Sequence, residues 1–338
     1  MSATSATVES GASKETTMRA IVQRTYGSAD VLRLAGIAKP DIESNEVLVK
    51  VHAAGLDRGT WHLMTGLPYL GRLVFGLRVP KNPVPGLDVA GTVVAVGSDV
   101  TRFQAGDEVF GIARGSFAEY AVALEDKLAH KPRGLNFERA AVVPVSASTA
   151  LQGLRDAGRV EAGQKVLIVG ASGGVGTYAV QIAKAFGTEV TGVCSTAKVD
   201  LVRSIGADHV IDYTREDFAD GSQRYDLIID IGGNSRVSRL RRALTPTGTL
   251  VILGGEGGGN VTGVNRQIWA LALSPFVGQR LTTFIAKENH ADLETLSRFI
   301  EAGQLRPILD KAYPLAEAAD AMRHLEAGQA RGKIAITI

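Results

Sequence analysis

The sequence predicts an α/β protein in which a β-rich first part is followed by a doubly wound parallel sheet. The apolar run Val166-Leu167-Ile168-Val169 ends in glycine, and apolar residues then recur at helical spacing up to Phe186. This pattern is typical of a buried parallel strand that leads into a helix. From about Ala140 such strands alternate with helical patterns, whereas short β-prone runs broken by Gly, Pro and Asp precede it.

Length and composition favour a two-domain globular protein. The chain has 338 residues, of which 45% are hydrophobic and 21% are charged. Its net charge of +2 predicts no bulk attraction to nucleic acid or to an anionic membrane, although local patches are compatible with it. No apolar run approaches the roughly 20 residues that span a bilayer. The single cysteine, Cys194, excludes an internal disulfide and fits a reducing compartment, so we expect a cytoplasmic protein.

The order of these patterns divides the chain into segments. We expect a disordered N-terminal tail over 1–17, a β-rich domain over 18–139, a cofactor domain over 140–295 and a return to the first domain over 296–338. The predicted strands are 46–51, 89–96, 108–112, 117–122, 166–169, 189–193, 209–212, 226–230, 249–253, 280–285 and 333–338. Helical patterns over 291–302 and 316–327 precede the last strand.

The glycine-rich turn after residue 169 indicates a dinucleotide site. It joins a predicted strand to a predicted helix, so backbone N–H groups and the positive end of the helix converge on one place. Small residues there let a pyrophosphate approach the main chain. A second strand over 189–193 completes a βαβ unit, which is the context that such a motif requires. We therefore predict that the cofactor is bound by Ala171, Ser172, Gly173, Gly174 and Val175.

The end of the second strand of this unit favours NADP(H) over NAD(H). A carboxylate there would accept hydrogen bonds from the ribose hydroxyls of NAD, but this strand ends in Val193-Cys194-Ser195-Thr196-Ala197-Lys198. A ribose phosphate would instead meet the Ser195 hydroxyl and the Lys198 ammonium. The alternative is that Ser195 and Lys198 only begin the next helix.

Segments along nearly the whole chain from Met18 resemble the medium-chain dehydrogenase/reductase superfamily. They are Ala53-Ala54-Gly55-Leu56-Asp57, Pro85-Gly86-Leu87-Asp88-Val89-Ala90-Gly91, Gly106-Asp107-Glu108-Val109-Phe110-Gly111, Ser148-Thr149-Ala150, Gly173-Gly174-Val175-Gly176, Gly206-Ala207-Asp208 and Gly332-Lys333. The resemblance implies a GroES-like catalytic domain in two sequence pieces and a Rossmann cofactor domain between them. It also implies a substrate cleft at their junction and a homodimer joined through the sixth strand, 280–285.

The zinc-dependent relatives hold their metal at positions that look like Asp57, Leu87 and Val145 here. Leucine and valine cannot coordinate zinc and one carboxylate is not a site, so we predict no metal. The chain thus resembles the zinc-free quinone oxidoreductase-like branch. Without zinc to stabilise an alkoxide, hydride transfer to an α,β-unsaturated carbonyl or a quinone is favoured, because the charge delocalises onto oxygen. An enoyl-thioester reductase and a nucleotide-binding protein without turnover stay open as alternatives.

The resemblance also implies cofactor contacts outside the glycine-rich turn. They lie around the nicotinamide, its carboxamide and the ribose phosphate, and the residues are Thr149, Tyr213, Leu253, Phe284, Ile285 and Lys333. For the proton that must follow the hydride, the candidates are His62 and Tyr69, because imidazole and phenol can donate one. Solvent or the cofactor ribose can serve instead.

Two apolar runs, 67–77 and 268–276, are unusual beside so much Pro and Gly. They could line the mouth of a pocket for a hydrophobic substrate, form a subunit contact, associate loosely with a membrane surface, or be buried in the fold.

Overall fold

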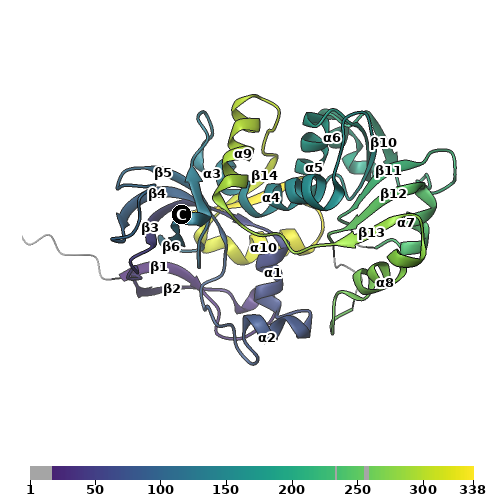
Figure 1. Ribbon diagram of the computed structural model, residues 1–338. Helices are drawn as coiled ribbons and strands as arrows, with labels where there is room; N and C mark the ends of the chain where they lie inside the picture. The colour runs from purple at the N-terminus through teal and green to yellow at the C-terminus, as the bar shows by residue number, and fades with distance from the viewer. Residues whose placement is uncertain (1–16, 233, 255–258) are drawn as a thin grey trace, which may run out of the picture.

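The computed structural model describes residues 17–232, 234–254 and 259–338. Two large sheets, each with its own helices, lie side by side, and residues 17–22 and 33–38 form a separate two-stranded sheet (Figure 1). The predicted N-terminal tail lies outside the described residues except for Thr17, which begins the first strand.

The first sheet and its surroundings are built from both ends of the chain. The strands are β1 (Thr17–Val22), β2 (Arg33–Ala38), β3 (Glu46–Leu56), β4 (Asp88–Val96), β5 (Glu108–Ile112), β6 (Tyr120–Leu124), β7 (Leu128–His130), β14 (Leu309–Pro314) and β15 (Lys333–Thr337). The helices are α1 (Arg58–Thr65), α2 (Arg72–Phe75), α3 (Phe137–Ala141) and α10 (Ala318–Glu326), with the short turns η1 (Ala29–Val31), η2 (Tyr69–Gly71), η3 (Glu125–Lys127) and η7 (Leu315–Glu317).

The second sheet comes from the middle of the chain. Its strands are β8 (Lys165–Val169), β9 (Glu189–Cys194), β10 (His209–Asp212), β11 (Tyr225–Asp230), β12 (Leu244–Ile252) and β13 (Arg280–Thr283). Its helices are α4 (Pro144–Gln152), α5 (Gly174–Ala185), α6 (Val199–Ser204), α7 (Val237–Ala243), α8 (Asn265–Leu273) and α9 (His290–Glu301), with the π-helix η4 (Gly153–Gly158) and the short 3-10 helices η5 (Thr196–Lys198) and η6 (Ser274–Phe276).

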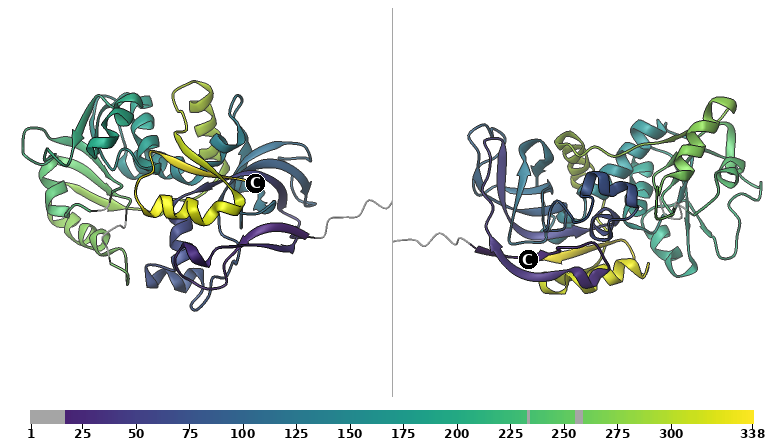
Figure 2. Two further views of the ribbon diagram at one scale, coloured as in Figure 1. Left: turned by 180° about the vertical axis from the view of Figure 1, so that it is seen from behind. Right: turned by 90° about the horizontal axis from the view of Figure 1, so that it is seen from below.

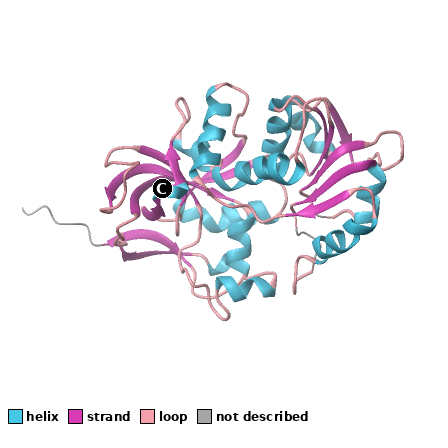
Figure 3. Ribbon diagram, in the orientation of Figure 1, coloured by secondary structure: helices cyan, strands magenta, loops and turns pink. Residues whose placement is uncertain are grey.

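The second sheet is parallel throughout and has the order β10-β9-β8-β11-β12-β13. Counted within the sheet this is 3-2-1-4-5-6, the doubly wound order, so the predicted fold class is confirmed. Helices lie on both faces (Figure 3). Alternate residues of β8 enter the two layers: Val166 and Ile168 pack with α4 and α5, whereas Leu167 packs with α7.

The C-terminal segment completes the first sheet. β15 lies inside the first sheet, between β14 and the antiparallel β3, so that sheet has the order β14-β15-β3-β4-β5-β7. In Figure 2 the yellow C-terminal strands and α10 lie against the purple N-terminal segments. A residue near the start of β15 can therefore reach elements of both sheets.

Candidate functional site

The turn between β8 and α5 is held tightly by backbone contacts. Gly170 has φ +89°, a conformation that favours glycine, and the N–H groups of Gly170 and Ala171 both donate to the Val193 carbonyl at 3.1 Å. A Cβ on Gly176 would lie 2.1 Å from the Gly170 carbonyl oxygen. Helix α5 therefore begins directly against the turn, and only glycine allows that approach at position 176.

The first turn of α5 can receive an anion. Its N-cap residue, Gly173, makes no side-chain capping hydrogen bond, and the nearest heavy atom to a Cβ built there is 3.5 Å away. The leading N–H groups and the positive helix end thus face a side with room for a ligand. Ala171, Ser172, Gly173, Gly174 and Val175, all predicted to bind the cofactor, form this turn. A dinucleotide pyrophosphate fits the arrangement.

Lys333 supports the turn from the first sheet. It is only 2% exposed, and its Nζ donates to Ser146 Oγ at 2.9 Å and lies 3.6 Å from Asp88 Oδ2. A Cβ on Gly174 would lie 3.0 Å from Lys333 Cδ and 3.6 Å from Ser146 Oγ. The predicted cofactor residue Lys333 therefore lies against the start of α5, with its ammonium bound inside the protein.

Asp88 is the buried counter-ion of this lysine. Its Oδ1 accepts a hydrogen bond from the Val145 N–H at 2.8 Å, and its side chain is fully buried. Burial raises the pKa of Asp88 to about 7, with Lys333 opposing the rise and the neighbouring Asp57 adding to it. The charge of the pair therefore depends on pH near neutrality.

One face of α4 links this turn to the strand ends of the second sheet. Ser146, Thr149 and Gly153 are spaced three and four residues apart and share that face. Thr149 Oγ1 donates to the Val145 carbonyl at 2.7 Å. A Cβ on Gly153 would lie 3.2 Å from Leu253 Cδ1 and 3.6 Å from Phe284 Cε1. The structure thus places Thr149 between the glycine-rich turn and the predicted contacts Leu253 and Phe284.

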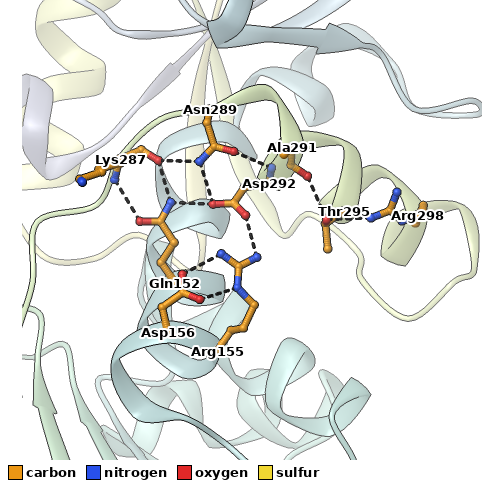
Figure 4. A network of polar contacts seen from close by, with 9 residues as sticks. All are labelled: Gln152, Arg155, Asp156, Lys287, Asn289, Ala291, Asp292, Thr295 and Arg298. Atoms are coloured by element: carbon orange, nitrogen blue, oxygen red, sulfur yellow. Dashed lines mark hydrogen bonds and ion pairs between the residues drawn. The ribbon is translucent and has the colours of Figure 1, made fainter.

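A polar network fixes the segment after β13 to the end of α4 (Figure 4). Gln152 Nε2 donates to the Lys287 carbonyl and to Asp292 Oδ2, both at 2.7 Å, and Arg155 forms an ion pair with Asp292 at 2.7 Å. Burial opposes ionisation of Asp292, but hydrogen bonds from Arg155, Gln152 and Asn289 hold its pKa below the usual value. The backbone beside Phe284 is therefore anchored.

The other end of the site lies where β9 and β10 end. Lys198 Nζ donates to the carbonyls of Gly328 at 3.0 Å and Ala330 at 2.8 Å. Burial lowers the pKa of Lys198, and nearby Arg331 lowers it further against the opposing effect of Asp310. Lys198 and Arg331 thus lie near each other at this end, and the Lys198 backbone N–H donates to the carbonyl of the half-buried Ser195 at 2.9 Å.

Tyr213 and Asp212 also lie near the ends of β9 and β10. Tyr213 is exposed, and its backbone N–H donates to the Cys194 carbonyl at 3.1 Å. Asp212 is buried and accepts from Thr196 and Thr214. This carboxylate is therefore engaged within the protein and is not presented to a ribose hydroxyl.

A cavity of about 680 Å³ lies between the two sheets' helices, next to the ends of β12 and β13. Its lining is largely apolar, and the residues are Arg58, Trp61, His62, Leu67, Pro68, Leu253, Gly259, Asn260, Gly263, Val264, Gln267, Ile268, Leu271, Thr283, Phe284 and Ile285. Because Leu253 and Phe284 belong both to this wall and to the surroundings of Thr149, the cavity adjoins the cofactor face.

The two predicted proton donors are placed differently. His62 lines the cavity, and its Nδ1 lies 2.7 Å from the Leu67 carbonyl oxygen. Since a carbonyl only accepts, this contact requires Nδ1–H and leaves Nε2 as the acceptor nitrogen of the neutral ring. Tyr69 is 52% exposed beside Arg72, whose guanidinium lies 4.8 Å from its ring, and it is not among the lining residues.

Side chains at the positions compared with zinc ligands have other roles. Asp57 Oδ1 caps α1 by accepting from the Thr60 N–H at 2.8 Å and hydroxyl at 3.1 Å. In the part of the chain that the structure describes, no group of three or more His, Cys, Asp or Glu could hold a metal ion.

Sequence reasoning missed Asp88 as a charged partner, Ser146, Arg331 and Gln267. The serine stands three residues before Thr149, so a search for polar residues on one helix face could have found it. No local pattern signals that Gln267, whose Nε2 donates to the Gly254 carbonyl at 3.2 Å, faces the cavity.

Two protein-family models match the chain. Residues 43–133 match an alcohol dehydrogenase GroES-like domain, and residues 205–336 match a family described as zinc-binding dehydrogenase.

Similar proteins cover nearly the whole chain. A 2-methylene-furan-3-one reductase of Solanum lycopersicum is 35% identical over 94% of this chain and 79% of its own. An NADPH-dependent alkenal/one oxidoreductase, chloroplastic, of Arabidopsis thaliana is 34% identical with the same coverage. The solved structure of the quinone oxidoreductase from Coxiella burnetii superimposes with a TM-score of 0.86 at 30% identity, covering 95% of this chain and 99% of that one.

Proposed function

Because the chain belongs to the medium-chain dehydrogenase/reductase superfamily, in its zinc-free quinone oxidoreductase-like branch, we propose that it is an NADPH-dependent reductase of α,β-unsaturated carbonyls or quinones. One observation carries the proposal: an open helix N-terminus behind a glycine-rich turn is joined, along one face of α4, to a largely apolar cavity. Such a site can hold a dinucleotide and a hydrophobic acceptor side by side.

Different residues of this chain would bind different parts of NADPH. The turn 171–175 would hold the pyrophosphate through its N–H groups, and Ser195 with Lys198 would hold the ribose phosphate, with Tyr213 beside them. Thr149, Leu253, Phe284 and Ile285 would border the nicotinamide end. Lys333 would keep the start of α5 in place through Ser146. When bound, NADPH supplies the hydride.

The cavity orients the acceptor and limits water. Trp61, Leu67, Ile268 and Leu271 give it apolar walls, which suit a hydrophobic enone or quinone. At the positions compared with zinc ligands, Leu87 and Val145 offer no donor atom, so we propose that no metal takes part. Negative charge on the acceptor oxygen would then be stabilised by hydrogen bonds.

His62 is the proposed proton donor. The Leu67 carbonyl holds Nδ1–H, so the second proton of the imidazolium would sit on Nε2, the nitrogen available to deliver it. Tyr69 is the second candidate and would have to turn toward the cavity from its exposed position.

Steady-state oxidation of NADPH with a panel of enones, quinones and enoyl thioesters tests the function. We expect turnover on enones or quinones. Tight NADPH binding without turnover on any acceptor would favour the nucleotide-binding alternative, and turnover on thioesters alone would favour the enoyl-thioester reductase.

The same assay assigns the proton donor. We expect His62→Asn to lower kcat about a hundredfold, the lower end for general acid catalysis, with NADPH affinity unchanged. Tyr69→Phe should leave kcat within twofold of the wild type, roughly the effect of a surface change. An unchanged kcat in both variants would assign the proton to solvent or to the cofactor ribose.

We also propose a homodimer joined through β13. This strand ends the second sheet, so its outer edge has backbone groups available for pairing, and the neighbouring Phe276 is exposed. Light scattering should give the dimer mass; a monomer at working concentration would contradict the proposal.

The compartment proposed is the cytoplasm, because the single cysteine needs no oxidising environment and is buried as a free thiol. Cell fractionation tests this. In the described residues no helix has both the length and the apolar character needed to cross a membrane.

A further inference from the structure

Exposed apolar side chains gather on and around α2. This short helix lies below α1 in the view of Figure 1. Leu73, Val74 and Leu77 are 64%, 68% and 68% exposed. We call the whole group the α2 surface; its members are Tyr69, Leu70, Leu73, Val74, Leu77, Val79 and Val261, each more than half exposed. A patch of this kind is a sign of an interaction site.

The α2 surface is continuous with the mouth of the cavity. The Tyr69 N–H donates to the Asn260 carbonyl at 2.7 Å, and the Leu70 N–H donates to the Val261 carbonyl at 3.0 Å. A Cβ on Gly263 would lie 2.7 Å from Pro68 Cγ. Since Pro68, Asn260 and Gly263 all line the cavity, whatever covers the α2 surface also faces its entrance.

The segments that form this surface lack negative charge. Across the chain 35 of 338 residues are acidic, about one in ten, yet residues 58–87 and 257–287 contain neither Asp nor Glu. The first segment carries four Arg or Lys residues, and two of them, Arg78 and Lys81, are exposed next to Leu77 and Val79. The patch is therefore apolar with a basic border.

We propose that the α2 surface docks the protein on an anionic lipid bilayer, with the entrance of the cavity facing the lipid. Short apolar side chains can enter the headgroup boundary, an amphipathic tyrosine suits that depth, and Arg and Lys attract anionic headgroups. A second copy of the chain would meet the same basic border with its own, which disfavours that occupant. Docking would let a hydrophobic acceptor pass from the bilayer into the cavity; this last step rests on the proposed function.

Co-sedimentation of the full chain with vesicles tests the docking without any catalysis. Vesicles of phosphatidylcholine alone are compared with vesicles containing phosphatidylglycerol as well. We expect binding to the anionic vesicles, at least about tenfold stronger than to the neutral ones and weakened by salt. Equal binding to both kinds, or no binding to either, would overturn the proposal.

Three variants locate the binding surface. Leu73→Asp with Val74→Asp, and separately Arg78→Glu with Lys81→Glu, should each reduce the partition onto anionic vesicles about tenfold or more. Leu34→Asp is the matched control, because Leu34 is an exposed apolar residue on β2, outside the α2 surface, and it should bind as the wild type does. Loss of binding only in the control would contradict the assignment.

Activity measurements separate this inference from the proposed function. A water-soluble enone should be reduced equally by the wild type and by both pairs of variants, which also shows that the variants fold. Anionic vesicles should speed the reduction of a lipid-dissolved quinone when the wild type is used, but not when either double variant is used. If the wild type does not reduce the soluble enone, the proposed function is wrong. Vesicle binding tests the docking proposal independently of that result. If sedimentation velocity without lipid shows self-association that Leu73→Asp with Val74→Asp abolishes, a second copy covers the surface and the bilayer proposal is wrong.

Discussion

The proposed cofactor side and the proposed acceptor side of the site are built in opposite ways. Around the glycine-rich turn, Gly170, Gly176 and Lys333 are fixed by backbone approach and buried ion pairing. Around the cavity, the walls come from α1, α8 and loops, and side chains such as Ile268 and Ile285 are exposed. The contrast teaches that the part proposed to bind one unchanging ligand is fixed by many close contacts, while the part proposed to receive varied acceptors is formed by exposed apolar side chains.

Removing the lysine beneath the turn should have the largest effect. Lys333→Met leaves Asp88 buried without its cation, so we expect the free energy of unfolding at pH 8 to fall by roughly 3 to 5 kcal/mol. Because the pKa of Asp88 in the folded protein is about 7 against an ordinary 3.8, the folded state binds the extra proton between these values. Stability therefore falls as pH rises through that window, and the variant should lose more at pH 8 than at pH 5.

Urea unfolding from pH 5 to 8 measures this. The control is Asp88→Asn combined with Lys333→Met, which removes both charges and should show a much flatter pH dependence. A single variant that loses the same stability at pH 5 and pH 8 would mean that the ion pair is not the cause.

Substitution of a glycine in the turn between β8 and α5 should have the second-largest effect. Gly176→Ala places a Cβ 2.1 Å from the Gly170 oxygen, and moving α5 away should cost about 2 kcal/mol of stability and weaken NADPH binding. Gly173→Ala is the matched control: its nearest atom is 3.5 Å away, so stability should stay within about 0.5 kcal/mol while NADPH binding still weakens. Thermal melting and NADPH titration give both quantities. Equal melting temperatures for the two variants would refute the tight approach of α5.

The choice between cofactors should be the third effect. Lys198→Met is expected to weaken NADPH about tenfold to a hundredfold and to leave NADH unchanged, because a charged hydrogen bond is worth roughly 1.5–3 kcal/mol. Fluorescence titration with both dinucleotides measures it. Lys165→Met, at the opposite end of the sheet, should change neither affinity. If Lys198→Met weakens the binding of NADPH and of NADH equally, Lys198 does not bind the ribose phosphate.

The smallest effect is expected on the acceptor side. Ile268→Ala should raise KM for a hydrophobic acceptor a few-fold and leave the melting temperature unchanged, because an exposed wall contributes little to folding and about 0.8 kcal/mol per CH₂ to binding. A small soluble enone should be affected less. A clearly lower melting temperature of Ile268→Ala would show that the cavity wall contributes to folding, as the glycine-rich turn does.

Sequence reasoning worked where the signal is local. Runs and spacings within a few residues predict the six strands of the second sheet and the turn 171–175. The observed β12 and β13 differ from the predicted strands 249–253 and 280–285 mainly in length, because β12 begins earlier, at Leu244, and β13 ends earlier, at Thr283. The class of fold follows from the same local alternation.

The remaining features depend on contacts between distant residues. Lys198 meets carbonyls of Gly328 and Ala330, and Lys333 meets Ser146 and Asp88, across separations that no periodicity encodes. The placement of Tyr69 depends on its pairing with Asn260, a residue of a loop without a pattern of its own. For such residues the sequence supplies the chemical group, and the tertiary fold decides what it faces.

The position of β15 has a consequence for how the protein is made. This strand leaves the ribosome long after β3, yet it lies in the same sheet, between β14 and β3. Until β15 has been synthesised, the edge of β3 has no neighbour on that side, and Asp88 lacks its partner Lys333. The second sheet comes from one continuous stretch in the middle of the chain, so it can fold before β15 completes the first sheet.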